Sequence, residues 1–210
     1  MKKILFFVVA IIFVNNVFAQ DLQKNIFGIR AGVNFSKIDF GFGALENKIS
    51  FNAGFSYEHL LKKDIPLYLE TGLHYSNKGY QTKEEDREKE TLSLNYLQIP
   101  LMLNYKFKVG KSYTIYPSAG VYYAYAISGN HQEIYCYDNC DEIYKYDAFD
   151  DEYGADVKRS DLGYRVGASA VWKKTVLSVG YEKSLINIGK DTDGLKVKNS
   201  NIFISLGLNF

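Results

Sequence analysis

His74 and Ser76 stand two residues apart in a stretch that alternates apolar and polar side chains. On an extended strand such residues share one face, so the imidazole and the hydroxyl would be neighbours, with Glu70 further along. A histidine beside a serine could supply the base and the nucleophile of a hydrolase. That reaction also needs an oxyanion hole and an oriented base, and the sequence marks neither. We therefore favour chance proximity over catalysis.

The chain has two cysteines, Cys136 and Cys140, separated by three residues. In an oxidising compartment such a pair favours a disulfide that closes a small loop. A zinc site needs about four ligands, and only His131 stands nearby, so metal binding is the weaker alternative. We predict the disulfide, and we predict no metal or other cofactor.

The polar stretch 129–160 is rich in carboxylates and tyrosines. Its acidic residues are Glu133, Asp138, Asp141, Glu142, Asp147, Asp150, Asp151, Glu152 and Asp156. Dense carboxylates can hold Ca²⁺, but this spacing matches no EF-hand loop, so calcium binding is left open. Tyrosines supply contact area at low entropic cost, which makes a protein or glycan partner the alternative to a plain solvated loop.

Residues 1–19 have the order of a secretory signal peptide: two lysines, the apolar run 4–14 and the small Ala19 at a cleavage position. The run is too short to cross a bilayer as a helix. Removing the segment takes two lysines from the 25 basic residues and leaves 23 against 24 acidic ones. A near-neutral mature chain gives no support for nucleic-acid binding. We expect export and one domain over 20–210.

The exported chain alternates apolar and polar residues with the period of β-strands. We predict strands near 26–38, 49–60, 66–79, 92–107, 113–128, 161–172, 175–185 and 200–210. Short connections near 61–65, 108–112 and 173–174 alternate with long polar ones near 39–48, 80–91, 129–160 and 186–199. Short periplasmic turns and long external loops are typical of outer-membrane barrels. The sequence therefore predicts an all-β fold, an eight-stranded antiparallel up-and-down transmembrane β-barrel with a long extracellular loop 129–160.

A soluble lipocalin-like barrel has the same period but turns its apolar face inward. In the first strand Phe27 and Ile29 lie opposite Gly28 and Asn34, and the polar faces are rich in Gly, Ser and Asn. Small residues weaken a strand that faces water, whereas they suit the narrow interior of an eight-stranded barrel. We therefore predict that the polar faces fill the lumen and the apolar faces contact lipid.

On that assignment six charged side chains point inward: Arg30, Glu58, Glu70, Lys106, Arg165 and Glu182. Buried charges need partners, so we predict that these cations and anions pair as an ionic network that plugs the barrel. The alternative is a proton or ion path through the same residues, for which so narrow a barrel leaves little room.

The segment 95–107 contains Tyr96, Leu97, Ile99 and Pro100 in a Tyr-Leu-x-Ile-Pro pattern, followed by alternating apolar residues. With the strand pattern of 28–36 and the signal that ends at Ala19-Gln20, this resembles the PorT-like outer-membrane β-barrel family of Bacteroidetes. Pro100 also removes one ladder donor, which predicts a bulge or a local interruption of its strand.

The resemblance implies a barrel inserted by the outer-membrane assembly machinery, which recognises a terminal strand ending in an aromatic residue, here Phe210. One class of relatives serves protein secretion, and the family has no shared catalytic residues.

Our leading hypothesis is a non-enzymatic barrel in the outer membrane of a Gram-negative bacterium, with a scaffold or surface-binding role. Its expected partners are outer-membrane lipid, the assembly machinery and a protein or glycan at 129–160, with no nucleic acid. The alternatives are a soluble lipocalin-like ligand carrier and a lipid-modifying outer-membrane enzyme that uses His74 and Ser76.

Overall fold

The structure is a computed structural model that describes residues 22–39, 46–82, 88–110, 112–135, 142–150, 154–190 and 196–210. The strands are β1 (Asn25–Asp39), β2 (Glu46–Lys62), β3 (Ile65–Gln81), β4 (Glu88–Tyr105), β5 (Phe107–Val109), β6 (Tyr113–Tyr135), β7 (Glu142–Asp147), β8 (Ser160–Trp172), β9 (Thr175–Ser184) and β10 (Lys198–Asn209). In this part of the chain, no helix is long and apolar enough to cross a membrane. The predicted signal 1–19 lies outside the described residues.

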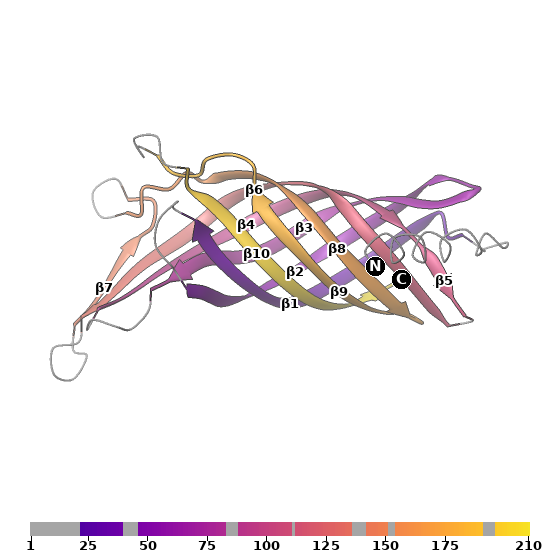
Figure 1. The fold of residues 1–210 in the computed structure, drawn as a ribbon, viewed down its shortest axis with the longest axis horizontal. Coiled ribbons are helices and arrows are strands. Elements are labelled where there is room, and N and C mark those ends of the chain that lie inside the picture. Colours follow the sequence, from indigo (N-terminus) through magenta and orange to yellow (C-terminus); the bar gives the residue numbers. More distant parts are fainter. Residues whose placement is uncertain are drawn as a thin grey trace, which may run out of the picture.

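Eight of the strands form a closed antiparallel ring, in the order β1, β2, β3, β4, β6, β8, β9 and β10. The first strand pairs with the last, from Gly28 opposite Asn209 to Asp39 opposite Lys198. Figure 1 shows these strands wrapping obliquely around one axis. The predicted eight-stranded up-and-down barrel is confirmed.

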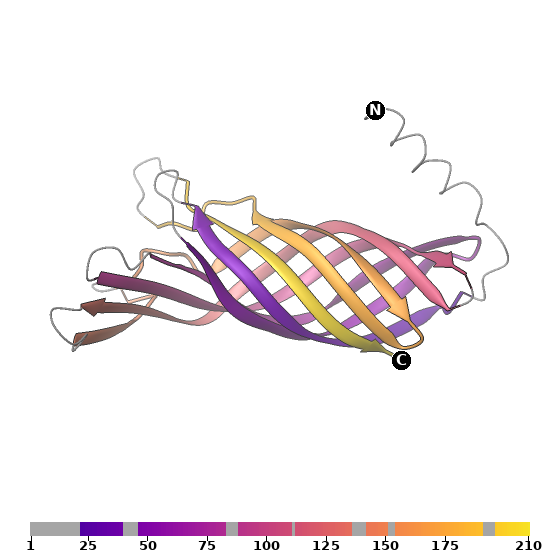
Figure 2. The same cartoon turned by 60° about the horizontal axis from the view of Figure 1, so that its bottom comes forward.

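The two ends of the barrel differ. Short connections at 63–64, 110–112 and 173–174 and the chain terminus Phe210 lie at one end, which we call the turn end. The longer connections lie at the opposite end, which we call the loop end, and Figure 2 shows both ends from a second side. The predicted alternation of short and long connections is therefore present.

The predicted loop 129–160 is a loop only in part, which corrects the sequence-based boundaries. Strand β6 continues for 23 residues, seven beyond the predicted end at 128, and β7 follows it. The upper part of β6 pairs with β4 on one side and with β7 on the other, from Asn130 opposite Asp147 to Tyr135 opposite Glu142. Figure 1 shows these three strands projecting past the ring at the loop end. We call residues 88–94, 129–135 and 142–147 the extension.

The two faces of the wall have opposite chemistry. The side chain of Phe55 in β2 is 70% exposed, whereas Glu58, on the opposite face, is 1% exposed. In β10, Ile204 and Leu206 are exposed while Ser205 is buried. Exposed apolar side chains around a polar interior are the reverse of a soluble barrel. The alternative of a lipocalin-like carrier therefore does not fit this fold.

Apolar clusters cover both ends of the polar interior. At the loop end the largest one combines strand residues such as Leu94 and Tyr96 with Ala148, Val157 and Ile188 from the connections. At the turn end Ile26, Leu60 and Tyr68 form a smaller cluster, against which Leu22 packs. Buried charged side chains such as Glu58, Glu70 and Glu182 lie on the strands of the wall.

Pro100 interrupts one ladder, as predicted. The pairing of β3 with β4 skips from Thr71 opposite Leu101 to His74 opposite Gln98, while the register stays the same. Because proline has no N–H to donate, the missing pairs follow from its chemistry. The bulge on this strand lies elsewhere, between Asn95 and Tyr96 in the ladder with β6.

Candidate functional site

Four of the six predicted lumen charges lie close together in the interior. We call these four, Arg30, Glu58, Glu70 and Lys106, together with Asn104, the Glu58 cluster. Glu58 and Glu70 stand directly opposite each other in the β2–β3 ladder. Lys106 Nζ lies 2.7 Å from Glu58 Oε2, and Arg30 Nη2 lies 3.6 Å from Glu58 Oε1. Asn104 Nδ2 donates to Glu70 Oε2 at 2.6 Å and to Glu58 Oε2 at 3.3 Å. Both cations thus pair with Glu58, and the amide of Asn104 bridges the two adjacent carboxylates.

The other two predicted charges meet nearer the loop end. Arg165 and Glu182 stand opposite each other in the β8–β9 ladder, and Arg165 Nη1 lies 3.4 Å from Glu182 Oε1. Lys78 Nζ lies 2.8 Å from Glu182 Oε2, and Gln98 Nε2 donates to Glu182 Oε1 at 2.7 Å. Asn201 Nδ2 also donates to this carboxylate, at 3.2 Å. We call these five residues the Glu182 cluster.

Aromatic rings pack against the buried cations. Lys106 Nζ lies 4.4 Å from the ring centre of Tyr68, and Lys78 Nζ lies 4.4 Å from that of Tyr122. The guanidinium of Arg165 stacks 4.0 Å from the ring centre of Phe203. A Cβ at Gly180 would lie 2.4 Å from the Phe203 ring, so only glycine leaves room for this ring. Cation–π contacts are stronger for buried cations than for exposed ones, and the side chains of these three cations are largely buried.

Sequence reasoning missed three buried charged residues, Lys48, Lys78 and Asp161. Lys78 and Asp161 lie on the polar faces of their strands, because Lys78 alternates with His74 and Ser76 on β3 and Asp161 alternates with Arg165 on β8. Asp161 Oδ2 accepts hydrogen bonds from the hydroxyl of Tyr122 at 3.2 Å and from Asn199 Nδ2 at 3.1 Å. Following the alternation of polar and apolar side chains along the full length of each strand would have found these residues.

His74 and Ser76 are both buried in the filled interior. Ser76 Oγ accepts a hydrogen bond from Asn34 Nδ2 at 3.0 Å, whereas His74 Nε2 is buried without a hydrogen-bond partner. No hydrogen bond joins His74 to Ser76 within the described residues. The cavity that both residues line, together with Arg165 and Glu182, has a volume of about 10 Å³. That is room for about one water molecule, which leaves no place for a lipid substrate.

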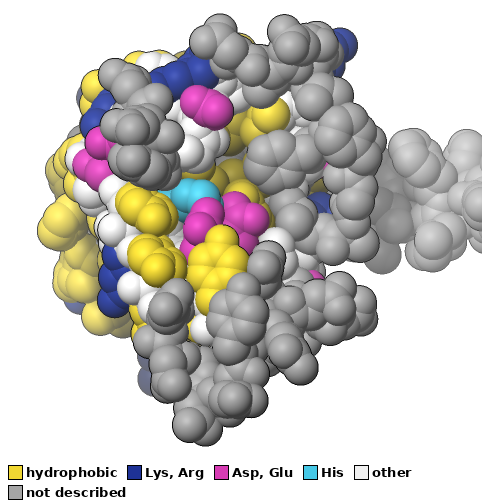
Figure 3. All heavy atoms as spheres, turned by 90° about the vertical axis from the view of Figure 1, so that its left-hand side faces the viewer, with side chains coloured by type: hydrophobic (Ala, Val, Ile, Leu, Met, Phe, Trp, Pro, Cys, Tyr) yellow, Lys and Arg dark blue, Asp and Glu magenta, His cyan; other side chains and the backbone are white. Residues whose placement is uncertain are grey.

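The extension carries a second polar group, around His131. His131 Nε2 lies 2.8 Å from Glu90 Oε1 and 3.9 Å from Glu133 Oε1, and the hydroxyl of Tyr80 donates to Glu90. Figure 3 shows a histidine beside acidic side chains at the loop end. In the part of the chain that the structure describes, no group of three or more His, Cys, Asp or Glu side chains is arranged to hold a metal ion.

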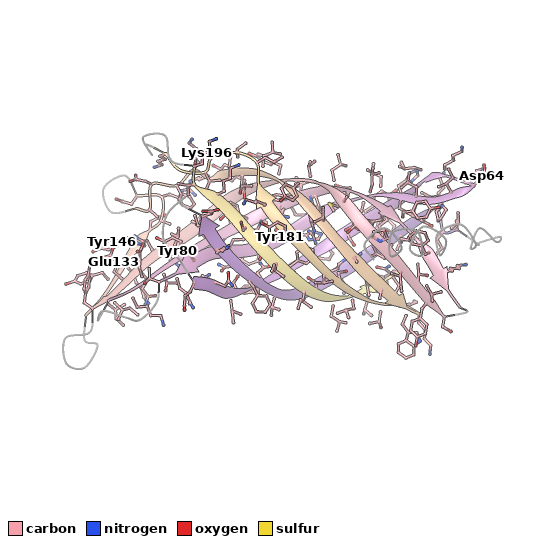
Figure 4. The ribbon with its side chains drawn as sticks, in the orientation of Figure 1. Asp64, Tyr80, Glu133, Tyr146, Tyr181 and Lys196 are labelled. Atoms are coloured by element: carbon pink, nitrogen blue, oxygen red, sulfur yellow. The ribbon has the colours of Figure 1, made fainter. Side chains whose placement is uncertain are left out.

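Tyrosines line the extension in a row. The rings of Tyr144 and Tyr146 on β7 are parallel, with centres 6.5 Å apart, and Tyr135 on β6 meets Tyr144 edge-on at 6.0 Å. Figure 4 shows Tyr146, Glu133 and Tyr80 close together at the loop end, far from Asp64 at the turn end. Within the described residues β7 pairs with β6 alone. Cys136 and Cys140, predicted to form a disulfide, lie outside the described residues.

Comparison with known proteins agrees with this architecture. The family model described as an outer membrane protein beta-barrel domain matches residues 18–189. No curated protein matches the chain in sequence.

Several solved structures are similar to this chain. Ail, the attachment invasion locus protein of Yersinia pestis, is 13% identical, with 90% of this chain and 100% of that chain covered and a TM-score of 0.42. Neisserial surface protein A is 11% identical, with 91% and 100% covered and a TM-score of 0.45. A major outer membrane protein from Thermus thermophilus is 13% identical, with 90% and 100% covered and a TM-score of 0.48. On the match of the family model, the chain belongs to the outer membrane protein β-barrel domain family.

Proposed function

We propose that this protein is a non-enzymatic outer-membrane barrel with a closed interior, and that its extension binds a protein or glycan partner outside the cell. The observation that carries the proposal is the contrast between a packed lumen and a projecting, tyrosine-rich sheet. On this proposal the turn end faces the periplasm, as short turns do in such barrels.

The closed interior argues for a scaffold rather than a pore. Carboxylates and cations form buried ion pairs in the Glu58 and Glu182 clusters, and the apolar cluster around Leu94 and Ile188 covers them at the loop end. Eight strands leave an interior that side chains can fill completely. The six charged residues predicted from the sequence would accordingly serve as an ionic plug.

The extension supplies what a binding surface needs. Tyr144 is 43% exposed and Ile143, on the opposite face of β7, is 56% exposed. Aromatic side chains offer large contact areas at low entropic cost, and the backbone edge of β7 offers hydrogen bonds to an extended ligand. A disulfide between Cys136 and Cys140 would stiffen the tip, and a mass shift of two hydrogens on reduction of the purified protein would reveal it.

The test is crosslinking in intact cells through a photoreactive residue placed at Lys145 on β7. We expect a crosslinked species that is lost in Tyr144→Ser, because that change removes the exposed ring. Tyr113→Ser is the matched control, since Tyr113 is 54% exposed but lies at the turn end. Digestion of the species with proteases or glycosidases assigns the class of partner. A crosslinked species that persists unchanged in Tyr144→Ser would remove the tyrosine row from the binding surface.

We propose further that Phe210 is the terminal signal for assembly. Its backbone N–H donates to the carbonyl of Phe27 at 2.8 Å, which joins the last residue to the first strand. We expect Phe210→Ala to lower the amount of folded protein in the outer-membrane fraction several-fold. Phe51→Ala is the control, because Phe51 and Phe210 are both 57% exposed. An equal loss in both variants would show a general effect of losing an apolar side chain.

The PorT-like assignment is a finer proposal, supported by the Tyr96 to Pro100 pattern. Tyr96 is fully buried, and its hydroxyl accepts a hydrogen bond from Asn199 Nδ2 at 3.2 Å. A link to protein secretion would follow from this assignment. Comparing the proteins secreted by cells with and without the gene tests the link, and unchanged secretion would remove it.

A further inference from the structure

A pocket of about 360 Å³ lies at the turn end, opposite to the extension. Four lysines line it: Lys106 from the break between β4 and β5, Lys108 from β5, and Lys173 and Lys174 from the β8–β9 turn. No acidic side chain of the described residues lines it. The volume falls within the usual range of small-ligand pockets, so a small ligand has room to bind.

The positive charge of this pocket is largely unneutralised. Lys106 pairs with Glu58 at 2.7 Å, but no ion pair within the described residues engages Lys108, Lys173 or Lys174. Phe210 also lines the pocket, and Lys174 Nζ lies 5.9 Å from its ring centre. A concave site lined by one sign of charge concentrates ligands of the opposite sign.

The rest of the lining is apolar or uncharged and polar. Ile26 and Tyr68, both buried, supply an apolar surface, and Thr114 and Asn209 supply hydrogen-bonding groups. Ile26 and Tyr68 belong to the inward faces of their strands, whereas lipid tails contact the outward faces. The pocket is therefore suited to a ligand from the aqueous side of the membrane.

We propose that this pocket binds a soluble periplasmic peptide through its free carboxylate, with the adjoining apolar side chain against Ile26 and Tyr68. The lysines hold the carboxylate by charge-assisted hydrogen bonds, and Thr114 and Asn209 pair with the peptide backbone. The periplasmic source of the peptide rests on the proposed orientation of the turn end. The extension takes no part in this site, so failure of partner binding at the extension leaves the pocket proposal standing.

The chain provides its own reporter for the test. Trp172 is the single tryptophan of the chain, and Lys173 Nζ lies 5.0 Å from its ring centre. The protein is purified from outer membranes and titrated with N-acetyl-alanyl-leucine and separately with its carboxyl-terminal amide. Trp172 fluorescence and titration calorimetry are both recorded. We expect saturable binding of the free acid and none of the amide.

Two variants locate the binding. Lys173→Gln combined with Lys174→Gln, and separately Lys108→Gln, should each weaken binding of the acid about tenfold, as loss of a charge-assisted contact does. Lys62→Gln combined with Lys63→Gln is the matched control, because these exposed lysines flank another turn at the same end and do not line the pocket. Heat-modifiable gel mobility verifies that every variant is folded.

Three results would overturn the proposal. One is no heat or fluorescence change with the acid, and another is equal binding of acid and amide. The third is a binding signal of the same size with inorganic phosphate, or with nanodiscs of anionic phosphatidylglycerol in place of phosphatidylcholine. This signal would also have to be equal in the pocket variant and in the control variant. That third pattern would indicate general attraction of anions or of a lipid surface to the lysines.

Discussion

Glu182 shows how single residues keep this interior closed. Its carboxylate oxygen Oε1 contacts Arg165 and Gln98, and Oε2 contacts Lys78 and Asn201. Each oxygen therefore has two donors. A buried ion pair gains little over an apolar pair, but removing one partner leaves an uncompensated charge. The energetic importance of Glu182 therefore lies in the cost of losing it.

We predict that Glu182→Gln lowers the free energy of unfolding by about 3–5 kcal/mol, because Lys78 and Arg165 lose their counter-charge. Urea unfolding in lipid vesicles measures the loss. Asp64→Asn, at an exposed position of the β2–β3 turn, should change the free energy by less than about 0.5 kcal/mol.

A rescue variant separates charge from packing. Glu182→Gln combined with Lys78→Met should recover part of the loss, since fewer uncompensated cations remain. If the double variant is less stable than Glu182→Gln alone, packing of Lys78 against Tyr122 outweighs its charge, and the electrostatic explanation fails.

The alternation of polar and apolar residues predicted that all six charged residues face one side of the wall, but it could not predict which of them meet. Which side chains meet depends on the register between strands, which places Glu58 opposite Glu70 and Arg165 opposite Glu182. Register follows from turn lengths and bulges along the whole sheet. Lys78 is missing from the prediction although it has the right parity, so that omission came from applying the rule incompletely.

Among the elements, β6 does two tasks at once. Residues 113–125 pair with β8 and close the ring, whereas residues 130–135 pair with β7 in the extension. The carbonyl of Gly129 accepts a hydrogen bond from the N–H of Ala148 at 3.1 Å, so the two ends of the β6–β7 hairpin already touch. The barrel and the extension are thus separable at this point.

We predict that replacing residues 130–147 by a two-residue turn leaves a folded barrel, because the β6–β8 ladder and Ala148 are retained. Heat-modifiable mobility should persist in this variant, which also lacks the Lys145 position used for crosslinking. A chain that no longer folds after this deletion would show that the extension is part of the barrel's own stability.

The strands within the wall were predictable because lipid on one side and a polar lumen on the other impose a strict alternation. That contrast weakens beyond the membrane, where both faces of a sheet can meet water. Tyr135 and Tyr144 therefore looked like parts of a loop, and the pairing that continues through 129–135 went unpredicted. The apolar alternation therefore ended before β6 did.

At the scale of the whole molecule, the barrel is a tube filled by paired charges and covered by apolar clusters at both ends. We predict that the purified protein in planar bilayers shows no stable channel conductance. An open porin reconstituted in the same bilayers serves as the control. Stepwise, ion-selective currents would contradict a closed interior and would favour a path through the charged residues.

The central claim is that the apolar faces contact lipid while the polar faces fill the lumen, and two conservative substitutions test it. In a Trp172→Phe background, a tryptophan is placed at Phe55, which is exposed, or at Phe203, which is buried inside. Phe55→Trp fluorescence should be strongly quenched by lipids brominated on their acyl chains, and Phe203→Trp fluorescence should be nearly unaffected. Strong quenching at position 203 with none at position 55 would contradict the account.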